Sequence, residues 1–205
     1  MQDSSIKSYP VMESFLSIQG EGGHQGKTAH FIRLAGCDVG CPWCDVPESW
    51  ETSDHETRTI LDLSQEVQES PAPFVVVTGG EPAMHNLTHL TEAIHEHKRK
   101  SHIETSGAYP LSGHWDWICV SPKRFKKPLD SVLVQAHEIK VVIAHRNDLR
   151  WAQKFAEAGN ESTRYFLQPE WSVVDEVMPQ LLSFMNEHPK CCLLYTSPSP
   201  RDLRK

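Results

Sequence analysis

The stretch Cys37-Asp38-Val39-Gly40-Cys41-Pro42-Trp43-Cys44 is the most informative part of the chain. Its cysteines follow a C-x3-C-x2-C spacing, with an aromatic residue just before the third. Three thiolates ligate only three irons of a four-iron cubane, so the fourth iron stays open to a small molecule with donor atoms. The stretch therefore predicts an iron–sulfur cluster that does chemistry on a bound ligand.

A zinc site is the alternative for these cysteines. Zinc requires a fourth ligand and a closed tetrahedron, and none of the twelve histidines stands in the usual paired spacing relative to the loop. Disulfides are not expected, because cytoplasmic cysteines stay reduced. Cys119 lies in the apolar run 117–120, which favours a buried core thiol.

Composition limits the class of protein. The chain has 205 residues, 39% of them hydrophobic, which is enough for one domain with its own core, expected over residues 1–190. The formal net charge of −7 argues against a nucleic-acid surface. No apolar stretch approaches the ~20 residues of a membrane span, and no signal-peptide core follows Met1. We expect a cytoplasmic protein that binds neither nucleic acid nor membranes.

Short strand-like runs alternate with helical patterns. Strands are expected at 14–18, 30–34, 74–77, 102–105, 115–120, 138–143 and 165–167. Helices are expected at 61–69, from 86 to about 100, at 147–159, and at 173–188 with a kink or break at Pro179. Alternation of this kind predicts a parallel sheet covered by helices. Since so few strands cannot close an eight-stranded barrel, we predict an α/β fold: a partial (β/α) barrel of about six mostly parallel strands.

Five polar motifs follow predicted strands. They are 19–23, the cysteine loop, 78–82, 104–107 and 121–123. Ligand sites in such sheets lie at the carboxyl ends of the strands, so we expect all five motifs at one rim.

Two of these motifs allow a structural explanation as well. In Thr78-Gly79-Gly80-Glu81-Pro82 the glycines would let the backbone pass close to a ligand and the carboxylate could bind an ammonium; the alternative is a turn that ends the strand. Gln19-Gly20-Glu21-Gly22-Gly23 is either a binding loop or a flexible turn. Arg33 alternates with Ile32 and Leu34, and faces either an anionic partner inside or the solvent.

The end of the chain differs in composition from the rest. Residues 191–205 turn abruptly to Ser, Pro and Arg without a strand or helix period, and are interpreted as a disordered or non-native tail. Residues 192–202 resemble translated sequencing-adapter read-through.

The cysteine loop followed by Gly-Gly-Glu-Pro resembles the radical S-adenosylmethionine superfamily. Further segments narrow the resemblance: Ser17-Ile18-Gln19-Gly20-Glu21-Gly22, Arg33-Leu34-Ala35-Gly36-Cys37, Cys44-Asp45, Glu104-Thr105-Ser106-Gly107, Ser121-Pro122-Lys123 and Leu167-Gln168-Pro169. With them the chain resembles the 7-carboxy-7-deazaguanine synthase family, over about residues 10–190.

The resemblance implies a 4Fe–4S cluster on Cys37, Cys41 and Cys44, with S-adenosylmethionine at its open iron. The residues implied to bind that cofactor are Trp43, Cys44, Asp45, Gly80, Glu81, Ser106, Ser121, Pro122, Lys123 and Gln168.

The implied substrate is 6-carboxy-5,6,7,8-tetrahydropterin, a small-molecule pterin. Its implied contacts are Ile18, Gln19, Gly20, Glu21, Arg33, Thr78 and Glu104, with Arg33 on the substrate carboxylate and the glutamates on its guanidine-like edge. The family's reaction takes a hydrogen from substrate C6, contracts the ring and releases ammonia on the way to queuosine precursors.

Two departures from the family stand out. Val46 replaces the usual threonine of a Mg2+ site, so this ion loses one side-chain oxygen. The family's ending, with a histidine in a Gln-Thr-His-Lys-like segment, is replaced by residues 191–205. The resemblance also implies an electron donor such as flavodoxin or ferredoxin, and leaves a homodimer open. The competing interpretations are an activase that makes a radical on another protein and a zinc-stabilised binding module without enzyme activity.

Overall fold

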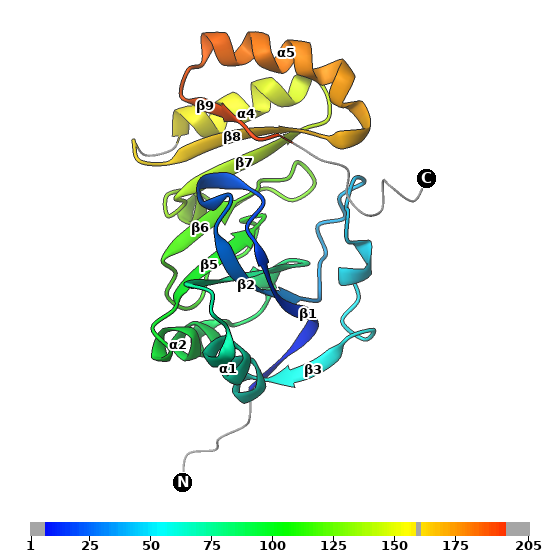
Figure 1. Cartoon of the computed structure of the whole chain (residues 1–205). Coiled ribbons are helices and arrows are strands. Elements are labelled where there is room, and N and C mark those ends of the chain that lie inside the picture. Colours follow the sequence, from blue (N-terminus) through cyan, green and yellow to red (C-terminus); the bar gives the residue numbers. More distant parts are fainter. Residues whose placement is uncertain (1–6, 159–160, 196–205) are drawn as a thin grey trace.

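Nine strands form one mixed sheet in the computed structural model, which describes residues 7–158 and 161–195 (Figure 1). The strands are β1 Ser8–Ile18, β2 Thr28–Leu34, β3 Glu56–Thr59, β4 Phe74–Gly79, β5 Lys100–Thr105, β6 Trp117–Val120, β7 Glu138–Ile143, β8 Arg164–Pro169 and β9 Cys191–Leu193. Their order in the sheet is β3-β1-β2-β4-β5-β6-β7-β8-β9. The sheet agrees with the predicted α/β class and exceeds the predicted six strands.

Seven strands, from β2 to β9 in sheet order, pair in parallel, whereas β1 runs antiparallel to both β2 and β3. Ile18 at the end of β1 therefore pairs with Thr28 at the start of β2. The loop 19–27 therefore begins at the end of the sheet where the parallel strands have their amino ends, opposite to their carboxyl ends. The expectation of five motifs at one rim is wrong for 19–23, because it assumed that β1 was parallel.

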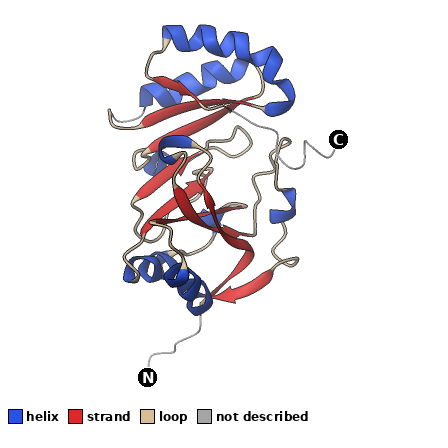
Figure 2. Ribbon diagram, viewed as in Figure 1, coloured by secondary structure: helices blue, strands red, loops and turns tan. Residues whose placement is uncertain are grey.

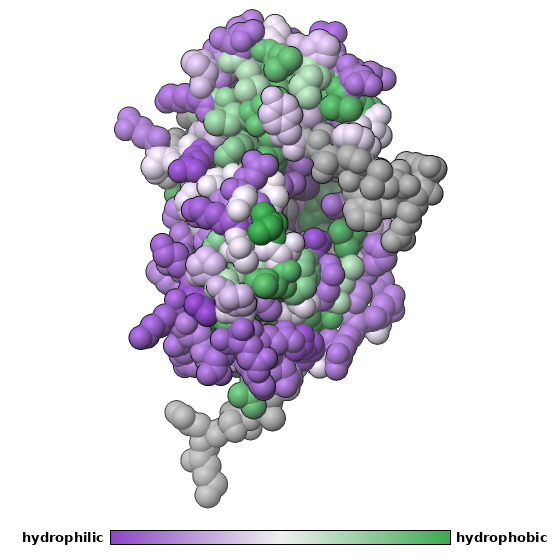
Figure 3. Space-filling model, in the orientation of Figure 1, coloured by the Kyte–Doolittle hydropathy of each residue, from purple (hydrophilic) through white to green (hydrophobic). Residues whose placement is uncertain are grey.

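Helices connect the parallel strands and lie outside the sheet (Figures 1 and 2). They are α1 Ile60–Glu69, α2 Thr88–Glu96, α3 Asp130–Leu133, α4 Asn147–Ala158 and α5 Val174–Glu187. A capping box of Thr59 and Asp62 starts α1. Figure 3 shows hydrophilic side chains covering the end of the molecule that carries α1, α2 and β3.

Two helix predictions differ from the structure, and a third is not tested. α2 ends at Glu96 instead of about Lys100, because Lys100 already pairs with Phe74 as the first residue of β5. Pro179 lies inside α5, which continues through it as one helix. The expected end of α4 at Gly159 lies outside the described residues.

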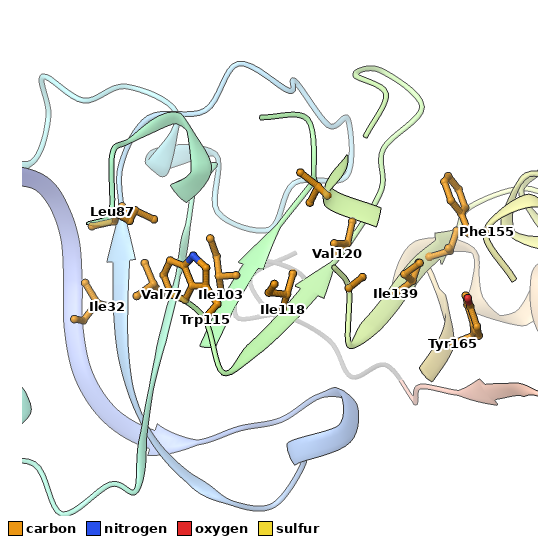
Figure 4. Packing of buried hydrophobic residues seen from close by; sticks show 14 of the residues in the cluster. Ile32, Val77, Leu87, Ile103, Trp115, Ile118, Val120, Ile139, Phe155 and Tyr165 are labelled. Atoms are coloured by element: carbon orange, nitrogen blue, oxygen red, sulfur yellow. The ribbon is translucent and has the colours of Figure 1, made fainter. Parts of the chain in front are cut away.

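The main core lies between the sheet and the helices. Figure 4 shows Ile32, Val77, Ile103 and Ile139, from β2, β4, β5 and β7, along this layer. Strand residues alternate between faces, so the neighbours Arg33, Thr78, Glu104 and Lys140 lie on the opposite, inner face. No helix covers that face in the described residues: it carries these polar side chains and a second, smaller apolar cluster of Ala29, Phe31, Phe74 and Val76.

The C-terminal segment contributes structure up to its last described residue. Cys191–Leu193 forms β9 beside β8, and Leu194, with 2% of its surface exposed, donates its N–H to Leu167 O at 2.9 Å. The expectation of a tail without strand structure is wrong for these residues. Residues 196–205 lie outside the described part, and the domain boundary at 190 stays a prediction. Within residues 7–158 and 161–195, every helix is too short or too polar to cross a lipid bilayer.

Candidate active site

The three cysteines lie in a loop between β2 and the 3-10 helix Pro47–Ser49, and each is partly exposed. The left-handed Gly40 (φ +68°) and the turn from Cys44 N to Cys41 O bend the loop back on itself. Desolvation raises the pKa of the Cys37 and Cys41 thiols, the neighbouring thiols add to this, and Lys123 opposes it at Cys41. The loop therefore gathers three thiols that deprotonate more easily once a metal binds.

A cubane fits this loop better than one zinc ion does. In the described residues no three side chains of His, Cys, Asp or Glu converge as they would on a single ion. A cubane places its thiolates on separate iron atoms, so the cysteines need not converge on one point.

The Gly79-Gly80 pair packs against the backbone of residues 34–36, which lead into the cysteine loop. A Cβ on Gly80 would lie 2.4 Å from Gly36 O, and one on Gly79 would lie 2.1 Å from Leu34 O. The close approach lets Glu81 N donate to Gly36 O at 2.8 Å. The glycines that suggested room for a ligand therefore provide room for the chain segment leading into Cys37.

Glu81 is buried, with 1% of its surface exposed, and its carboxylate is fully occupied. It accepts hydrogen bonds from Thr105 Oγ1 at 2.5 Å, Ser106 N at 2.7 Å, Ser106 Oγ and Ala83 N at 3.0 Å. Two predicted cofactor residues, Glu81 and Ser106, are thus in contact, and Glu81 fixes the loop after β5.

The segment after β6 reaches the cysteines from another side. Lys123 Nζ donates to Ser121 O at 2.7 Å and Ser121 Oγ at 2.6 Å, beside the buried Pro122. Burial lowers the pKa of Lys123, and the charge of Lys140 adds to this. Phe125 lies 5.4 Å from the Trp43 ring, centroid to centroid, and Asp45 is exposed.

One polar group on the inner face brings three predicted substrate residues together. Gln19 Nε2 donates to Glu104 Oε1 at 2.9 Å, and Thr78 Oγ1 donates to Glu104 Oε2 at 3.2 Å. Gln19 Oε1 also accepts from Glu21 N at 3.1 Å. The loop 19–27 thus reaches this face although it starts from the opposite edge of the sheet.

A second polar group joins the same loop to β7 and β8. The Glu21 carboxylate pairs with Lys140 Nζ and accepts from Gln168 Nε2 at 3.2 Å. Burial alone would raise the pKa of Glu21, but the charge and hydrogen bond of Lys140 lower it overall. Gln168, expected on the cofactor, therefore lies against a residue expected on the substrate.

The sequence interpretation missed Lys140 and Glu138. Both alternate with Ile139 and Val141 in a run interpreted only as a strand, although this alternation of charged and apolar residues is a signal for one polar face. Glu138 accepts from Gly23 N at 2.7 Å and holds the loop in place. A small cavity lined by Gln19, Glu104 and Glu138, among others, lies there.

Three predicted substrate residues lie apart from these groups. Ile18 is 54% exposed, and a Cβ on the exposed Gly20 would meet no atom within 4 Å. Arg33 forms an ion pair with Glu13, with 2.9 Å between Nε and Oε1, and lies over the Phe15 ring. The anionic partner expected for an inward Arg33 is thus supplied by the protein itself.

Comparison with known proteins is consistent across sequence and structure. Residues 31–164 match the model of the Radical SAM superfamily. The chain is 45% identical over 181 residues to the 7-carboxy-7-deazaguanine synthase of Flavobacterium psychrophilum, covering 88% of this chain and 86% of that one. It is 46% identical over 164 residues to the enzyme of the same name from Synechocystis sp., covering 80% and 79%. The crystal structure of QueE from Escherichia coli superposes with a TM-score of 0.81 at 29% identity, over 93% of this chain and 95% of that one.

Proposed function

The chain belongs to the 7-carboxy-7-deazaguanine synthase family of the radical SAM superfamily, and we propose that it converts 6-carboxy-5,6,7,8-tetrahydropterin to 7-carboxy-7-deazaguanine. It is a radical SAM lyase of 7-deazapurine biosynthesis. The observation that supports this substrate is the polar inner face, where Glu21 from the loop 19–27 and Glu104 from β5 present two carboxylates that are linked through Gln19.

Cys37, Cys41 and Cys44 hold the 4Fe–4S cluster in this proposal, and the remaining predicted cofactor residues surround S-adenosylmethionine. When bound, the cluster and S-adenosylmethionine supply the radical that starts the reaction. The chain's own part is to fix the cysteine loop through Gly80 and to set Ser106 through Glu81. Gln168 contacts Glu21, which favours a place for it on the substrate side.

Glu104 and Glu21 are the proposed partners of the guanidine-like edge of the substrate, because charge-assisted hydrogen bonds to carboxylates are strong and directional. Neutral donors, Gln19 and Thr78, orient Glu104 and leave its charge uncompensated by a direct ion pair. Arg33 would exchange Glu13 for the substrate carboxylate.

We propose that Mg2+ stimulates this enzyme weakly, because Val46 offers no side-chain oxygen to an ion that prefers six oxygen ligands. Val46→Thr is expected to increase the Mg2+ stimulation of turnover. A steep Mg2+ requirement in the unchanged protein would contradict this view. An electron donor such as flavodoxin or ferredoxin, a cytoplasmic location and a homodimer complete the proposal.

The test is anaerobic reconstitution with iron and sulfide, followed by S-adenosylmethionine, dithionite and the pterin, with detection of 7-carboxy-7-deazaguanine by mass spectrometry. We expect brown protein with about four irons per chain and product formation. Cys37→Ala should lose both, while Cys119→Ala, at a buried thiol on β6, should keep its iron. Colourless protein with about one zinc would refute the proposal. Cleavage of S-adenosylmethionine without conversion of the pterin would refute the substrate.

A further inference from the structure

Lys140 is a largely buried cation that has no part in the roles above. It lies in the middle of β7, between Ile139 and Val141, whose side chains belong to the core. Strand alternation therefore turns Lys140 to the inner face, where its side chain is 15% exposed. Burying an ammonium is costly unless it is paired, so its surroundings indicate its role.

Two carboxylates act on the ammonium, one in direct contact and one through its charge. Burial opposes the charge, but Glu21 and Glu104 raise the pKa of Lys140 above its usual value. Cys119 and Lys123 are its other ionisable neighbours. Its direct partner is Glu21, whose second oxygen accepts from Gln168. Lys140 therefore stays charged and acts chiefly on Glu21.

Glu21 is also joined to Glu104 through one side chain. Gln19 accepts from Glu21 N and donates to the Glu104 carboxylate. Two contacts thus set the position of Glu21 relative to Glu104: Gln19 holds the backbone N–H of Glu21, and Lys140 holds its carboxylate. Without Lys140 the carboxylate would retain only the 3.2 Å contact with Gln168 and would be free to rotate.

We propose that Lys140 is a positioning residue for the substrate, which holds the Glu21 carboxylate at the spacing from Glu104 that the donor edge of a pterin requires. This inference rests on the proposed function. A buried ion pair is weak evidence for a role in stability alone, because apolar residues of similar volume often replace such pairs without loss. Lys140 acts through Glu21 and does not itself contact the substrate.

A double-mutant cycle on the reconstituted holoenzyme tests this role. Lys140→Met should raise KM for 6-carboxytetrahydropterin roughly ten- to hundred-fold, as expected when a charged hydrogen bond is lost. The iron content and the cleavage of S-adenosylmethionine without substrate should stay unchanged. In a Glu21→Gln background, Lys140→Met should change KM by less than about two-fold, because the residue through which it acts is already altered. Lys154→Met, at an exposed lysine of α4, is the matched control and should leave KM unchanged.

Two results would overturn the role. Effects of Lys140→Met and Glu21→Gln that multiply would mean that Lys140 contacts the substrate directly, and an unchanged KM would mean that the pair is only structural. If Lys140→Met does not fold, Lys140→Arg is put through the same cycle; it keeps the charge and should raise KM less, and only when Glu21 is present.

Failure of this inference can be told apart from failure of the proposed function. A wild-type holoenzyme that cleaves S-adenosylmethionine but leaves the pterin unchanged refutes the function. A wild-type enzyme that makes product, with variants of unchanged KM, refutes only the role of Lys140.

Discussion

At the scale of single residues, the absence of a side chain is as informative as its presence. Gly80 lies so close to Gly36 that any Cβ would overlap backbone atoms, which cannot move away as a flexible side chain can. The same contact aligns Glu81 N with Gly36 O. The cysteine loop can therefore pack against this segment only because Gly80 has no Cβ.

Gly80→Ala is expected to displace the cysteine loop. The new Cβ would lie only 2.4 Å from Gly36 O, which forces a backbone shift at a cost of about 1–3 kcal/mol. Iron per chain after anaerobic reconstitution and the urea midpoint should both fall. Gly20→Ala is the control, since its Cβ meets no atom within 4 Å. Equal iron content in the two variants would contradict the supporting role.

His102 links stability to pH. It is buried, stacks on Phe74 with 4.3 Å between centroids, and burial lowers its pKa to about 3. Below about pH 6.5 the unfolded chain binds a proton that the folded chain refuses, so acidification favours unfolding.

The free energy of unfolding should fall by about 2 kcal/mol between pH 7 and pH 5 through His102 alone. His102→Phe keeps a stacked ring and should flatten this dependence in urea titrations at the two pH values. Burial also lowers the pKa of His24 and His30, so part of the slope should remain. An unchanged slope in His102→Phe would show that this ring is protonated in the folded protein.

At the scale of elements, the sequence predicted the helices and strands that have a local apolar pattern. It failed for strands whose existence or direction depends on pairing with another strand. The apolar run at β4 and the periodic pattern of α1 were predicted within a few residues. β3 was missed because Glu-Thr-Arg-Thr has no apolar period; it forms by pairing Thr57 and Arg58 with the start of β1. The direction of β1 was also wrong, since an isolated strand does not reveal the orientation of its neighbour.

Within the site, the same limit applies. The cysteine spacing and the glutamates identified residues that carry chemistry, but their partners come from distant elements. Lys140 meets Glu21 across 119 positions of sequence, and no local period reports that contact. Arg33 faces Glu13 for the same reason: the pairing of β1 with β2 brings them together.

The strand β9 yields a prediction at this scale. Leu194 is buried beside β8, whereas the next residue, Tyr195, is 77% exposed. Leu194→Asp should lower the free energy of unfolding by about 3 kcal/mol, because it buries a charge and removes apolar contacts. Tyr195→Asp should change it by less than about 0.5 kcal/mol. Urea denaturation measures both, and similar small losses would mean that the segment does not pack as β9.

At the scale of the whole molecule, the loop 19–27 closes the open side of the curved sheet. Glu21 touches β7 and β8, although β2, where the loop ends, is separated from β7 by β4, β5 and β6. Gly22 (φ +66°) makes this closure possible, because a Cβ there would lie 2.3 Å from Glu138 Oε1. The sheet and its closing loop are thus fitted to each other.

Gly22→Ala should weaken the closure. Its left-handed backbone and its overlap with Glu138 both oppose a side chain, so we expect a loss of about 2–3 kcal/mol and a higher KM for the pterin. Gly26→Ala, also left-handed (φ +84°) but without an atom within 4 Å, should show the backbone cost of about 1 kcal/mol alone. Equal losses of stability in the two variants, measured by urea denaturation, would show that the loop does not press on Glu138.

The reversed direction of β1 also means that two groups of proposed site residues reach the inner face by different routes. The loops assigned to the cofactor follow parallel strands, whereas Gln19 and Glu21 arrive on one short hairpin from the other edge. A change in this hairpin leaves the pairing of the parallel strands unaltered, but it has to keep the contacts with Glu138 and Lys140. Substitutions in this one hairpin would therefore change two of the proposed substrate contacts, Gln19 and Glu21, while the loops proposed for the cofactor stay the same.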